Sequence, residues 1–517
     1  MVFRSSTICW ISLAALCARP LDNACASDGG KRPIRMGSRG SIVAVHPGPA
    51  PAPSLAAFSS AAPHPEPRLA GFSPLVAITA TNERSRDDID YEHDLQLAYT
   101  CNPLALPSGA ACGSLSPPAH TNYVVGILDS GAVVDLIAGS ATFILGVDSY
   151  LTTNAIPIGG VGGTVNAFVT HPIGYYASGL GAVDGAGMLD TNALVGHSNT
   201  SLVAAPPIDC GNGEAVAAVI GTPFLAFYNS IISVDTPRRV VSDGQLFKSP
   251  DVIIEDPLFG LPQYDRLVAI EFGGFTPALT ASYYPVLDPE DLITPLLPTQ
   301  LSLSPLSIPL GGVFFATIQL REGPVGEGNP AQAIRVMVDT GAQSSIISPA
   351  VAANLSLPVQ PDFTVDVCGV GGFETGKSAY YVDYVRMNAL GGAMEFSNAP
   401  FVVLDLVSPE GDSLDGVLGM NFFWNRNIAL QPSLTTSGFL HVSNPIAVAP
   451  CDLDVDQRVD LDDFLILDSC LAGPMNVAGP ECRDADVDGS GTVDLADFRW
   501  VQSCYNGASA ADPGCGP

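Results

Sequence analysis

Apolar residues in this chain recur in short runs of strand length, separated by glycine, proline and small polar residues. Residues 75–80 alternate in character, and residues 313–320 form a longer run that is rich in aromatic and β-branched side chains. Two further apolar runs, at 124–128 and 336–338, each end directly at an aspartate. Long segments with helical spacing are few. The pattern predicts a chain that is mainly β.

The two apolar runs that end at an aspartate continue in related ways. After residue 338 the chain reads Asp339-Thr340-Gly341-Ala, and 210 residues earlier it reads Asp129-Ser130-Gly131-Ala. A lone Asp-Thr-Gly is a weak signal, because most such tripeptides are simply turns. Two copies, each at the end of a strand, suggest a pair of facing carboxylates.

The residue types have a chemical rationale. A carboxylate at the end of a buried strand is partly desolvated, and the glycine that follows allows a tight turn toward a symmetry mate. Two facing carboxyl groups share one proton, so Asp129 and Asp339 together can act as general base on a water and general acid on a carbonyl oxygen. The hydroxyls of Ser130 and Thr340 are suited to pinning the two loops by hydrogen bonds. This is the chemistry of amide hydrolysis without a covalent intermediate.

The segments downstream of the two aspartates also repeat each other. A glycine-rich hairpin tip comes about thirty residues later in each copy, and an apolar-apolar-Gly turn closes each unit at 218–225 and 416–423. The predicted tips consist of Gly160, Val161, Gly162 and Gly163 in the first copy and of Gly369, Val370, Gly371 and Gly372 in the second.

In these three features the chain resembles the retropepsin-like and pepsin-like aspartic proteases. The resemblance implies a bilobal β-barrel pseudo-dimer on one chain, with Asp129 and Asp339 as the catalytic dyad. It also implies support from Ser130-Gly131 and Thr340-Gly341, and two glycine-rich flaps that cover an extended peptide or protein substrate. The first lobe departs from the pattern at 133–135, where Val-Val-Asp replaces a serine-rich run.

The remaining segments set the predicted domain boundaries. Residues 1–26 resemble a secretory signal peptide ending in an Ala-x-Ala site, and the alternative is a buried amino-terminal helix. Residues 27–75 are rich in proline and alanine and suit a linker or propeptide with little that could pack. We expect lobe 1 at 76–250, an inter-lobe connection at 251–309 and lobe 2 at 310–445. An acidic stretch at 87–94 is interpreted as a solvated turn rather than a calcium site.

The composition changes at Cys451, where two twelve-residue loops with alternate oxygen donors begin. Such spacing converges on one hard cation, and the seventh position contributes its backbone carbonyl. The predicted calcium ligands are Asp452, Asp454, Asp456, Arg458, Asp460 and Asp463 in loop 1, and Asp486, Asp488, Ser490, Thr492, Asp494 and Asp497 in loop 2.

This region, 451–517, resembles the type I dockerin module, a small α-helical unit with two EF-hand-like calcium loops that docks a cohesin-like protein. Gln457 departs from the glycine expected at the sixth position of loop 1, which predicts weaker binding there. Similar spacings make Cys470 with Cys482, and Cys504 with Cys515, one possible disulfide connectivity. The alternative is an acidic disordered tail.

Charge and cysteine content narrow the function further. The chain has 21 basic and 52 acidic residues and a formal net charge of −31, which disfavours nucleic acid and anionic membranes as partners. Nine of the twelve cysteines follow residue 26, in keeping with export, and Cys368 is a candidate free thiol. No apolar run is long enough to span a membrane.

Two functions therefore stand as hypotheses. The first is a secreted or cell-surface aspartic endopeptidase attached to a partner through a calcium-binding dockerin-like module, with no cofactor in catalysis. The second is a non-catalytic, protease-like protein that binds peptides or a partner and carries the same anchor. A hydrolase built on Ser and His is disfavoured, because the nearest nucleophile motif, at 196–200, lacks its final glycine.

Overall fold

A computed structural model gives the arrangement of the chain, which is mainly β and contains two sheets. The structure describes residues 9–10, 42–47, 66–81, 123–273 and 312–516, with gaps at 162, 172, 185–186, 201, 206–216, 243–244, 257–259, 324–329, 370–371, 407–413, 433–436, 474–475, 477 and 508. The acidic stretch at 87–94 and the cysteines at 101, 112 and 210 lie outside the described residues. Among the described residues, no helix has the length and apolar character needed to cross a membrane.

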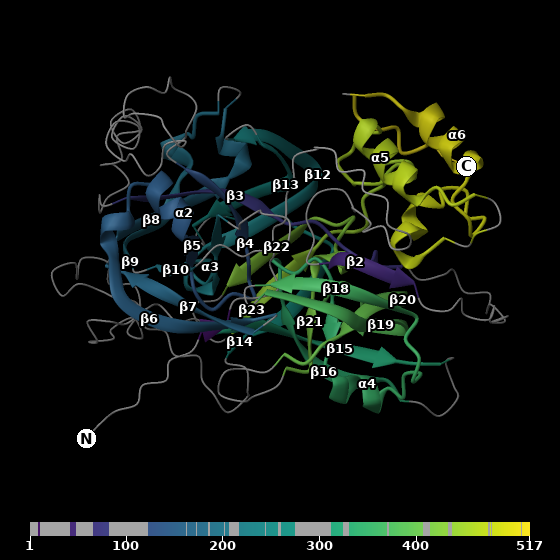
Figure 1. Cartoon of the computed structure of the whole chain (residues 1–517), viewed down its shortest axis with the longest axis horizontal. Coiled ribbons are helices and arrows are strands. Elements are labelled where there is room, and N and C mark those ends of the chain that lie inside the picture. The colour runs from purple at the N-terminus through teal and green to yellow at the C-terminus, as the bar shows by residue number, and fades with distance from the viewer. Residues whose placement is uncertain are drawn as a thin grey trace, which may run out of the picture.

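The first sheet has ten strands and forms most of lobe 1 (Figure 1). Its order is β1-β6-β7-β10-β5-β11-β4-β3-β8-β9. The strands are β1 (Cys9–Trp10), β3 (Leu75–Thr81), β4 (Val124–Leu128), β5 (Leu136–Ala138), β6 (Leu151–Gly160), β7 (Gly163–Thr170), β8 (Ile173–Gly179), β9 (Val195–Thr200), β10 (Val203–Ala205) and β11 (Ala218–Ile220).

The second sheet has thirteen strands, in the order β13-β12-β22-β23-β14-β15-β16-β21-β17-β20-β19-β18-β2. The strands are β2 (Ile42–Pro47), β12 (Asn229–Ser242), β13 (Gln245–Glu255), β14 (Arg266–Gly273), β15 (Val313–Arg321), β16 (Gln332–Val338), β17 (Ile346–Ile347), β18 (Phe363–Gly369), β19 (Gly372–Met387), β20 (Met394–Val403), β21 (Gly416–Leu418), β22 (Ile428–Pro432) and β23 (Ser437–Val442). Because β12 pairs with β22, this sheet runs from lobe 1 into lobe 2.

The two lobes repeat one topology. In lobe 1, β11 lies between β4, to which it is parallel, and β5, to which it is antiparallel. In lobe 2, β21 has the same relations to β16 and β17. Short helices follow at matching places: α2 (Gly139–Ile144) and α4 (Pro349–Asn354) after the aspartate loops, and α3 (Thr222–Leu225) and the 3-10 turn η7 (Met420–Phe422) after the closing turns. Further 3-10 turns are η2 (Asp148–Tyr150), η3 (Leu180–Ala182) and η4 (Thr191–Ala193).

Burial explains why the central strands read as continuous apolar runs. All five residues of β4 and the last three of β16 are buried. Strands covered on both faces carry apolar side chains at successive positions, not at alternate ones. One core cluster contains Val125 and Ala132 of lobe 1 together with Ala342 and Val417 of lobe 2. The lobes therefore share a core around the aspartate loops.

Two expected connecting segments contain ordered strands. In the predicted linker, residues 42–47 form β2 and pair with β18, so this segment does pack, because its backbone completes the edge of the lobe 2 sheet. The expected inter-lobe connection at 251–309 contains the end of β13 and all of β14, which pairs with β15 and β23. Both segments are rich in proline, which disfavours strands, so the sequence did not predict them.

The carboxyl-terminal region is helical and forms its own small core, drawn in yellow in Figure 1. Helix α5 (Leu461–Cys470) packs on α6 (Leu495–Cys504) through Phe464 and Phe498, whose rings lie edge to face at 5.0 Å. The 3-10 helix η8 (Pro480–Ala485) joins them.

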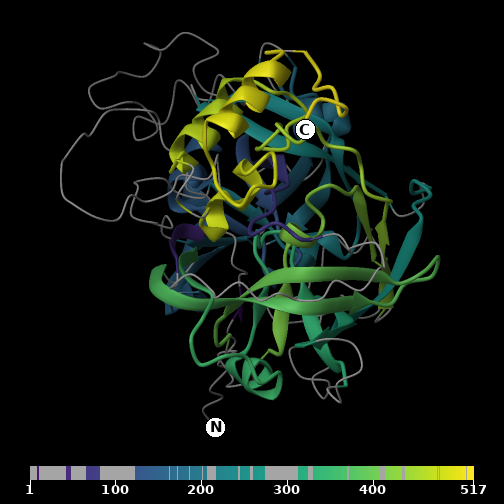
Figure 2. The same ribbon diagram turned by 90° about the vertical axis from the view of Figure 1, so that its right-hand side faces the viewer.

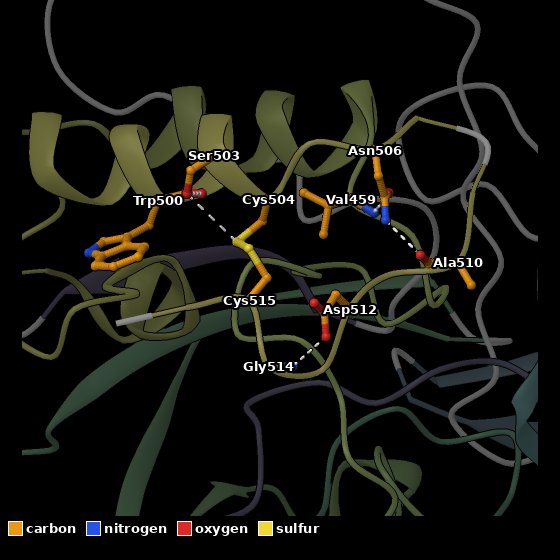
Figure 3. The surroundings of a disulfide bond; sticks show 9 residues. All are labelled: Val459, Trp500, Ser503, Cys504, Asn506, Ala510, Asp512, Gly514 and Cys515. Carbon is orange, nitrogen blue, oxygen red and sulfur yellow. Dashed lines mark hydrogen bonds between the residues drawn. A yellow bond between two sulfur atoms is a disulfide. The ribbon is translucent and has the colours of Figure 1, made fainter.

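Two disulfides, Cys470–Cys482 and Cys504–Cys515, close this region with the connectivity that the spacing suggested. Around the second, Asn506 exchanges backbone and side-chain hydrogen bonds with Val459, and its side chain donates to the carbonyl of Ala510 (Figure 3). The disulfide thus holds residue 515 against the end of α6, and the hydrogen bonds of Asn506 join this segment to Val459 in the first acidic loop.

Cysteine chemistry differs from expectation elsewhere. Cys368, the candidate free thiol, is disulfide-bonded, so that assignment is wrong. Among the described residues the free cysteine is Cys451, which is buried in the core of the carboxyl-terminal region. Burial raises the pKa of its thiol to about 11, with a further contribution from Asp463, so the group is an unreactive thiol at physiological pH.

Candidate active site

The two aspartates occupy equivalent positions at the centre of the molecule. Asp129 follows β4, and its backbone N–H donates to the carbonyl of Ile220 at 2.9 Å. Asp339 follows β16, and its N–H donates to the carbonyl of Leu418 at 3.0 Å. Each aspartate is therefore fixed by the closing strand of its own lobe. Both are fully buried.

Each carboxylate is also held by the turn that comes directly after it. Oδ1 of Asp129 accepts from the N–H groups of Gly131 and Ala132 at 2.9 and 3.0 Å. Oδ1 of Asp339 accepts from the corresponding two N–H groups, both at 2.9 Å. One oxygen of each aspartate is thus oriented by backbone dipoles in the same way in both lobes.

Four hydrogen bonds lock the two loops across the lobe boundary. The hydroxyl of Ser130 donates to the carbonyl of Val338 at 2.7 Å, and the hydroxyl of Thr340 donates to the carbonyl of Leu128 at 2.7 Å. Each hydroxyl also accepts from the other residue's backbone N–H at 3.0 Å. The exchange is reciprocal and buried, so it fixes the two aspartate loops at one separation.

The two loops approach each other closely. A Cβ atom on Gly341 would lie 2.5 Å from Cγ of Asp129 and 2.7 Å from its Oδ2. A side chain at this position is therefore excluded by the carboxylate of the opposite lobe. The Asp-Thr-Gly loop of lobe 2 packs directly on the catalytic candidate of lobe 1.

The closing glycines are required by the same kind of close approach. A Cβ atom on Gly221 would lie 2.2 Å from the carbonyl oxygen of Val134, and one on Gly419 would lie 2.7 Å from that of Ser344. The residue after each glycine donates its N–H to the carbonyl of the alanine in the Asp-x-Gly-Ala sequence, at 2.8 Å in both lobes. In each lobe the closing turn thus holds the aspartate loop in place by a backbone hydrogen bond.

Asp135 is the main chemical difference between the lobes. In lobe 2 the corresponding hydroxyl of Ser345 accepts from the N–H of Gly419 at 2.9 Å. In lobe 1, Oδ1 of Asp135 accepts from the N–H of Gly221 at 2.8 Å. A carboxyl group has replaced a hydroxyl in the same structural role. Burial raises the pKa of Asp135 from 3.8 to about 8, and the hydrogen bond from Gly221 opposes this only in part.

The glycine-rich tips lie on two equivalent hairpins. Gly160 pairs with Gly163 at the end of β6 and β7, and Gly369 pairs with Gly372 at the end of β18 and β19. Gly163 and Gly372 have φ angles of 124° and 118°, which only glycine adopts readily. Gly162, Val370 and Gly371 lie outside the described residues.

The two tips meet. A Cβ atom on Gly369 would lie 2.7 Å from Cβ of Val161, and Val161 is itself buried in the shared core. The hairpin tips of the two lobes therefore lie in contact with each other.

A segment ahead of lobe 1, residues 66–73, crosses the lobe 2 loop. The carbonyl of Leu69 accepts from the hydroxyl of Ser344 at 2.7 Å, and the hydroxyl of Ser73 accepts from Gln343 Nε2 at 2.7 Å. Leu69 is buried in the same core cluster as the aspartate loops. The sequence placed this segment in the linker, and nothing in its composition indicated that it supports the site.

The acidic loops of residues 451–517 bring carboxylates together as their spacing predicts. Carboxylate oxygens of Asp452, Asp454 and Asp463 lie within 4.8 Å of one another, as do those of Asp486, Asp488 and Asp497. Hard cations such as calcium are bound by such oxygen sets, so these residues could hold one ion in each loop. Within loop 1, burial and the charges of Asp463 and its neighbours raise the pKa of Asp452 to about 8.

The backbone of both loops fits the same turn. Asp452 accepts from the N–H groups of Asp456 and Gln457, and Asp486 accepts from those of Ser490 and Gly491. Gln457 has a φ of 62° where loop 2 has glycine, so loop 1 adopts the left-handed turn with an unfavourable residue. Replacing the expected glycine by Gln457 therefore raises the conformational free energy of the turn but keeps its left-handed geometry.

Comparison with known proteins bears on lobe 2. A family model described as aspartyl protease matches residues 325–422. The match covers Asp339, the β18–β19 hairpin and the closing turn at Gly419. Comparison with curated proteins found no match to the chain. The match supports an aspartyl-protease-like region and, at the level of the family, a peptidase-type hydrolase.

Proposed function

We propose that the protein is an aspartic endopeptidase in which Asp129 and Asp339 activate one water between them. The observation that carries the proposal is the reciprocal exchange of hydrogen bonds between Ser130 and Thr340, which holds the two loops as a symmetric pair. The family match covers lobe 2 alone, so the role of lobe 1 rests on this geometry.

The proposed reaction is general acid–base hydrolysis. One carboxylate of the pair takes a proton from the bound water while the other, protonated, donates to the carbonyl oxygen of the scissile amide. The resulting tetrahedral species collapses when its nitrogen is protonated, which releases an amine and a carboxylic acid and restores the shared proton. The meeting of Val161 and Gly369 supports a role for the hairpin tips as flaps over an extended peptide.

The test of this function is peptide hydrolysis at acidic pH on a mixed peptide library, with and without a statine-type inhibitor. Asp339→Asn should lower kcat/KM by at least about a thousandfold. A single positioned general acid or base contributes about 10²–10⁴-fold to the rate. Asp405→Asn is a matched control, since Asp405 is an exposed aspartate of the same lobe. No hydrolysis by the parent would favour a non-catalytic binding protein. Inhibitor-insensitive hydrolysis, or an active Asp339→Asn variant, would contradict the two-aspartate mechanism.

We further propose that residues 451–517 are a calcium-binding, dockerin-like module that anchors the enzyme to a cohesin-like protein outside the cell. The paired carboxylate clusters support calcium binding, and the two disulfides support an oxidising compartment. Isothermal titration of the full chain with calcium chloride should detect binding that Asp488→Asn weakens. A chain that takes up no calcium would contradict this part of the proposal.

A further inference from the structure

Two cations of lobe 1 face the first acidic loop. Arg239 on β12 and Lys248 on β13 are direct cross-strand partners in their hairpin. Like charges placed opposite each other destabilise a strand pair, so a strong counter-charge is needed at this place. Figure 1 and Figure 2 show the carboxyl-terminal helices lying beside this hairpin.

Loop 1 supplies that counter-charge. Nζ of Lys248 lies 2.7 Å from Oδ2 of Asp454 and 3.2 Å from Oδ2 of Asp456, and it also contacts Asp462. Nη2 of Arg239 lies 2.8 Å from Oδ2 of Asp460 and contacts Asp456. The Lys248 side chain is only 13% exposed. Its ammonium group is therefore withdrawn from water and held by loop carboxylates.

Three positions where loop 1 departs from loop 2 also contact lobe 1, alongside the shared Asp454 and Asp460. Asp456, Gln457 and Asp462 stand where loop 2 has Ser490, Gly491 and Ala496. Asp456 and Asp462 contact Lys248, and Gln457 Nε2 donates to the carbonyl of Val234 at 3.1 Å. In the described part of the chain, no ion pair joins loop 2 to either lobe.

We propose that loop 1 is a docking site for the Arg239–Lys248 pair of lobe 1, and that calcium and this pair compete for its carboxylates. The inference rests on the calcium binding proposed above and goes beyond it, because it divides the two loops between different tasks. Loop 2 remains a calcium site that is free of the protease lobes. Loop 1 joins the module to the enzyme when calcium is scarce.

Competition follows from the distances. A calcium ion needs oxygens at about 2.3–2.6 Å, and the carboxylate of Asp454 that would supply one already holds the Lys248 ammonium at 2.7 Å. Two cations on the same carboxylates repel each other, so calcium at loop 1 must displace the lysine. By linkage, docking weakens calcium binding by the same factor by which calcium weakens docking, so a variant that loosens docking should bind calcium more tightly.

The test is calorimetric titration of the full chain with calcium chloride in an Asp497→Ala background, which removes the carboxylate at the last position of loop 2 and leaves loop 1 to be measured. Lys248→Gln should tighten calcium binding at loop 1 by about tenfold or more, within the usual range of coupling between sites. Arg239→Gln should act in the same direction. Lys248→Arg keeps the charge and should stay within about twofold of the parent.

Lys377→Gln is a matched control, because Lys377 pairs with Glu374 on the lobe 2 hairpin. A second readout is hydrogen exchange in β12–β13, which calcium should accelerate in the parent and leave unchanged in Lys248→Gln. Equal calcium affinities for Lys248→Gln and the parent would overturn the competition, and so would a loop 1 that binds no calcium in any variant. Calcium binding by the chain with both loops intact separates these outcomes from a failure of the module's proposed function.

Discussion

Asp135 gives the stability of the protein a pH dependence that the Asp135→Asn variant should remove. The carboxyl group is buried, and its pKa is raised from 3.8 to about 8 because burial disfavours the charged form. A group whose pKa is raised on folding contributes stability that is fully present below its unfolded pKa. That contribution is lost as pH rises through the folded pKa. This contribution of Asp135 should therefore be lost between pH 4 and pH 8.

The magnitude is set by linkage. Each unit between the unfolded pKa and the working pH costs about 1.4 kcal/mol. Folding with Asp135 protonated should therefore cost about 4 kcal/mol at pH 7 and almost nothing at pH 4. Asp135→Asn does not titrate, and its side-chain oxygen can still accept from the N–H of Gly221. Relative to the parent, the variant should gain about 4 kcal/mol between pH 4 and pH 7.

The assay is urea unfolding, monitored by intrinsic fluorescence at pH 4, 5.5 and 7. Comparing the two proteins at each pH cancels the titration of every other carboxylate. Ser345→Ala is a matched control, since Ser345 holds the same position in lobe 2 and does not titrate in this range. A difference between Asp135→Asn and the parent that stays constant with pH would refute the reasoning.

Three further changes probe the site. Thr340→Val removes the hydroxyl that joins the lobes and leaves its buried partners unsatisfied, so it should lower the free energy of unfolding in urea by about 2–4 kcal/mol. Thr142→Val, whose hydroxyl bonds within its own turn, should cost about 1 kcal/mol. Equal costs would argue against a role for Thr340 in holding the two lobes together. Gly341→Ala puts a Cβ against the carboxylate of Asp129 and should reduce kcat/KM by at least about tenfold with KM little changed, which steady-state kinetics on a cleaved peptide would reveal. Gly369→Val should raise KM, because its side chain would collide with the facing flap tip, and kinetics unchanged from the parent would mean that the tips are surface turns.

The repeated part of the fold could be predicted from the sequence. The two Asp-x-Gly-Ala loops at Asp129 and Asp339, each followed by a glycine-rich tip and a closing glycine, predicted two equivalent lobes, because these repeated residues meet local steric or hydrogen-bonding demands. Asp135 was visible only as a departure from a serine. Its role as a substitute acceptor depends on Gly221, which lies 86 residues away in the chain.

Contacts without a local signature could not be predicted. Residues 66–73 bind the lobe 2 loop mainly through their backbone carbonyls and small polar groups, which any sequence can supply. Lys248 and Arg239 meet loop 1 more than 200 residues further along the chain, and a basic residue on a strand is ordinarily read as solvent-facing. These ion pairs can be recognised only in the folded structure, where the β12–β13 hairpin lies beside loop 1.

The most direct test of the shared-dyad mechanism is the single variant Asp129→Asn, because lobe 1 departs most from the family pattern and lies outside the matched residues. The measurement is kcat/KM on a cleaved peptide, together with the calorimetric stoichiometry of a statine-type inhibitor. We predict one inhibitor per parent chain, and at least about a thousandfold loss of turnover in Asp129→Asn, equal to that in Asp339→Asn. Near-normal turnover by Asp129→Asn, with Asp339→Asn inactive, would contradict this mechanism and would place the second carboxylate in another copy of lobe 2.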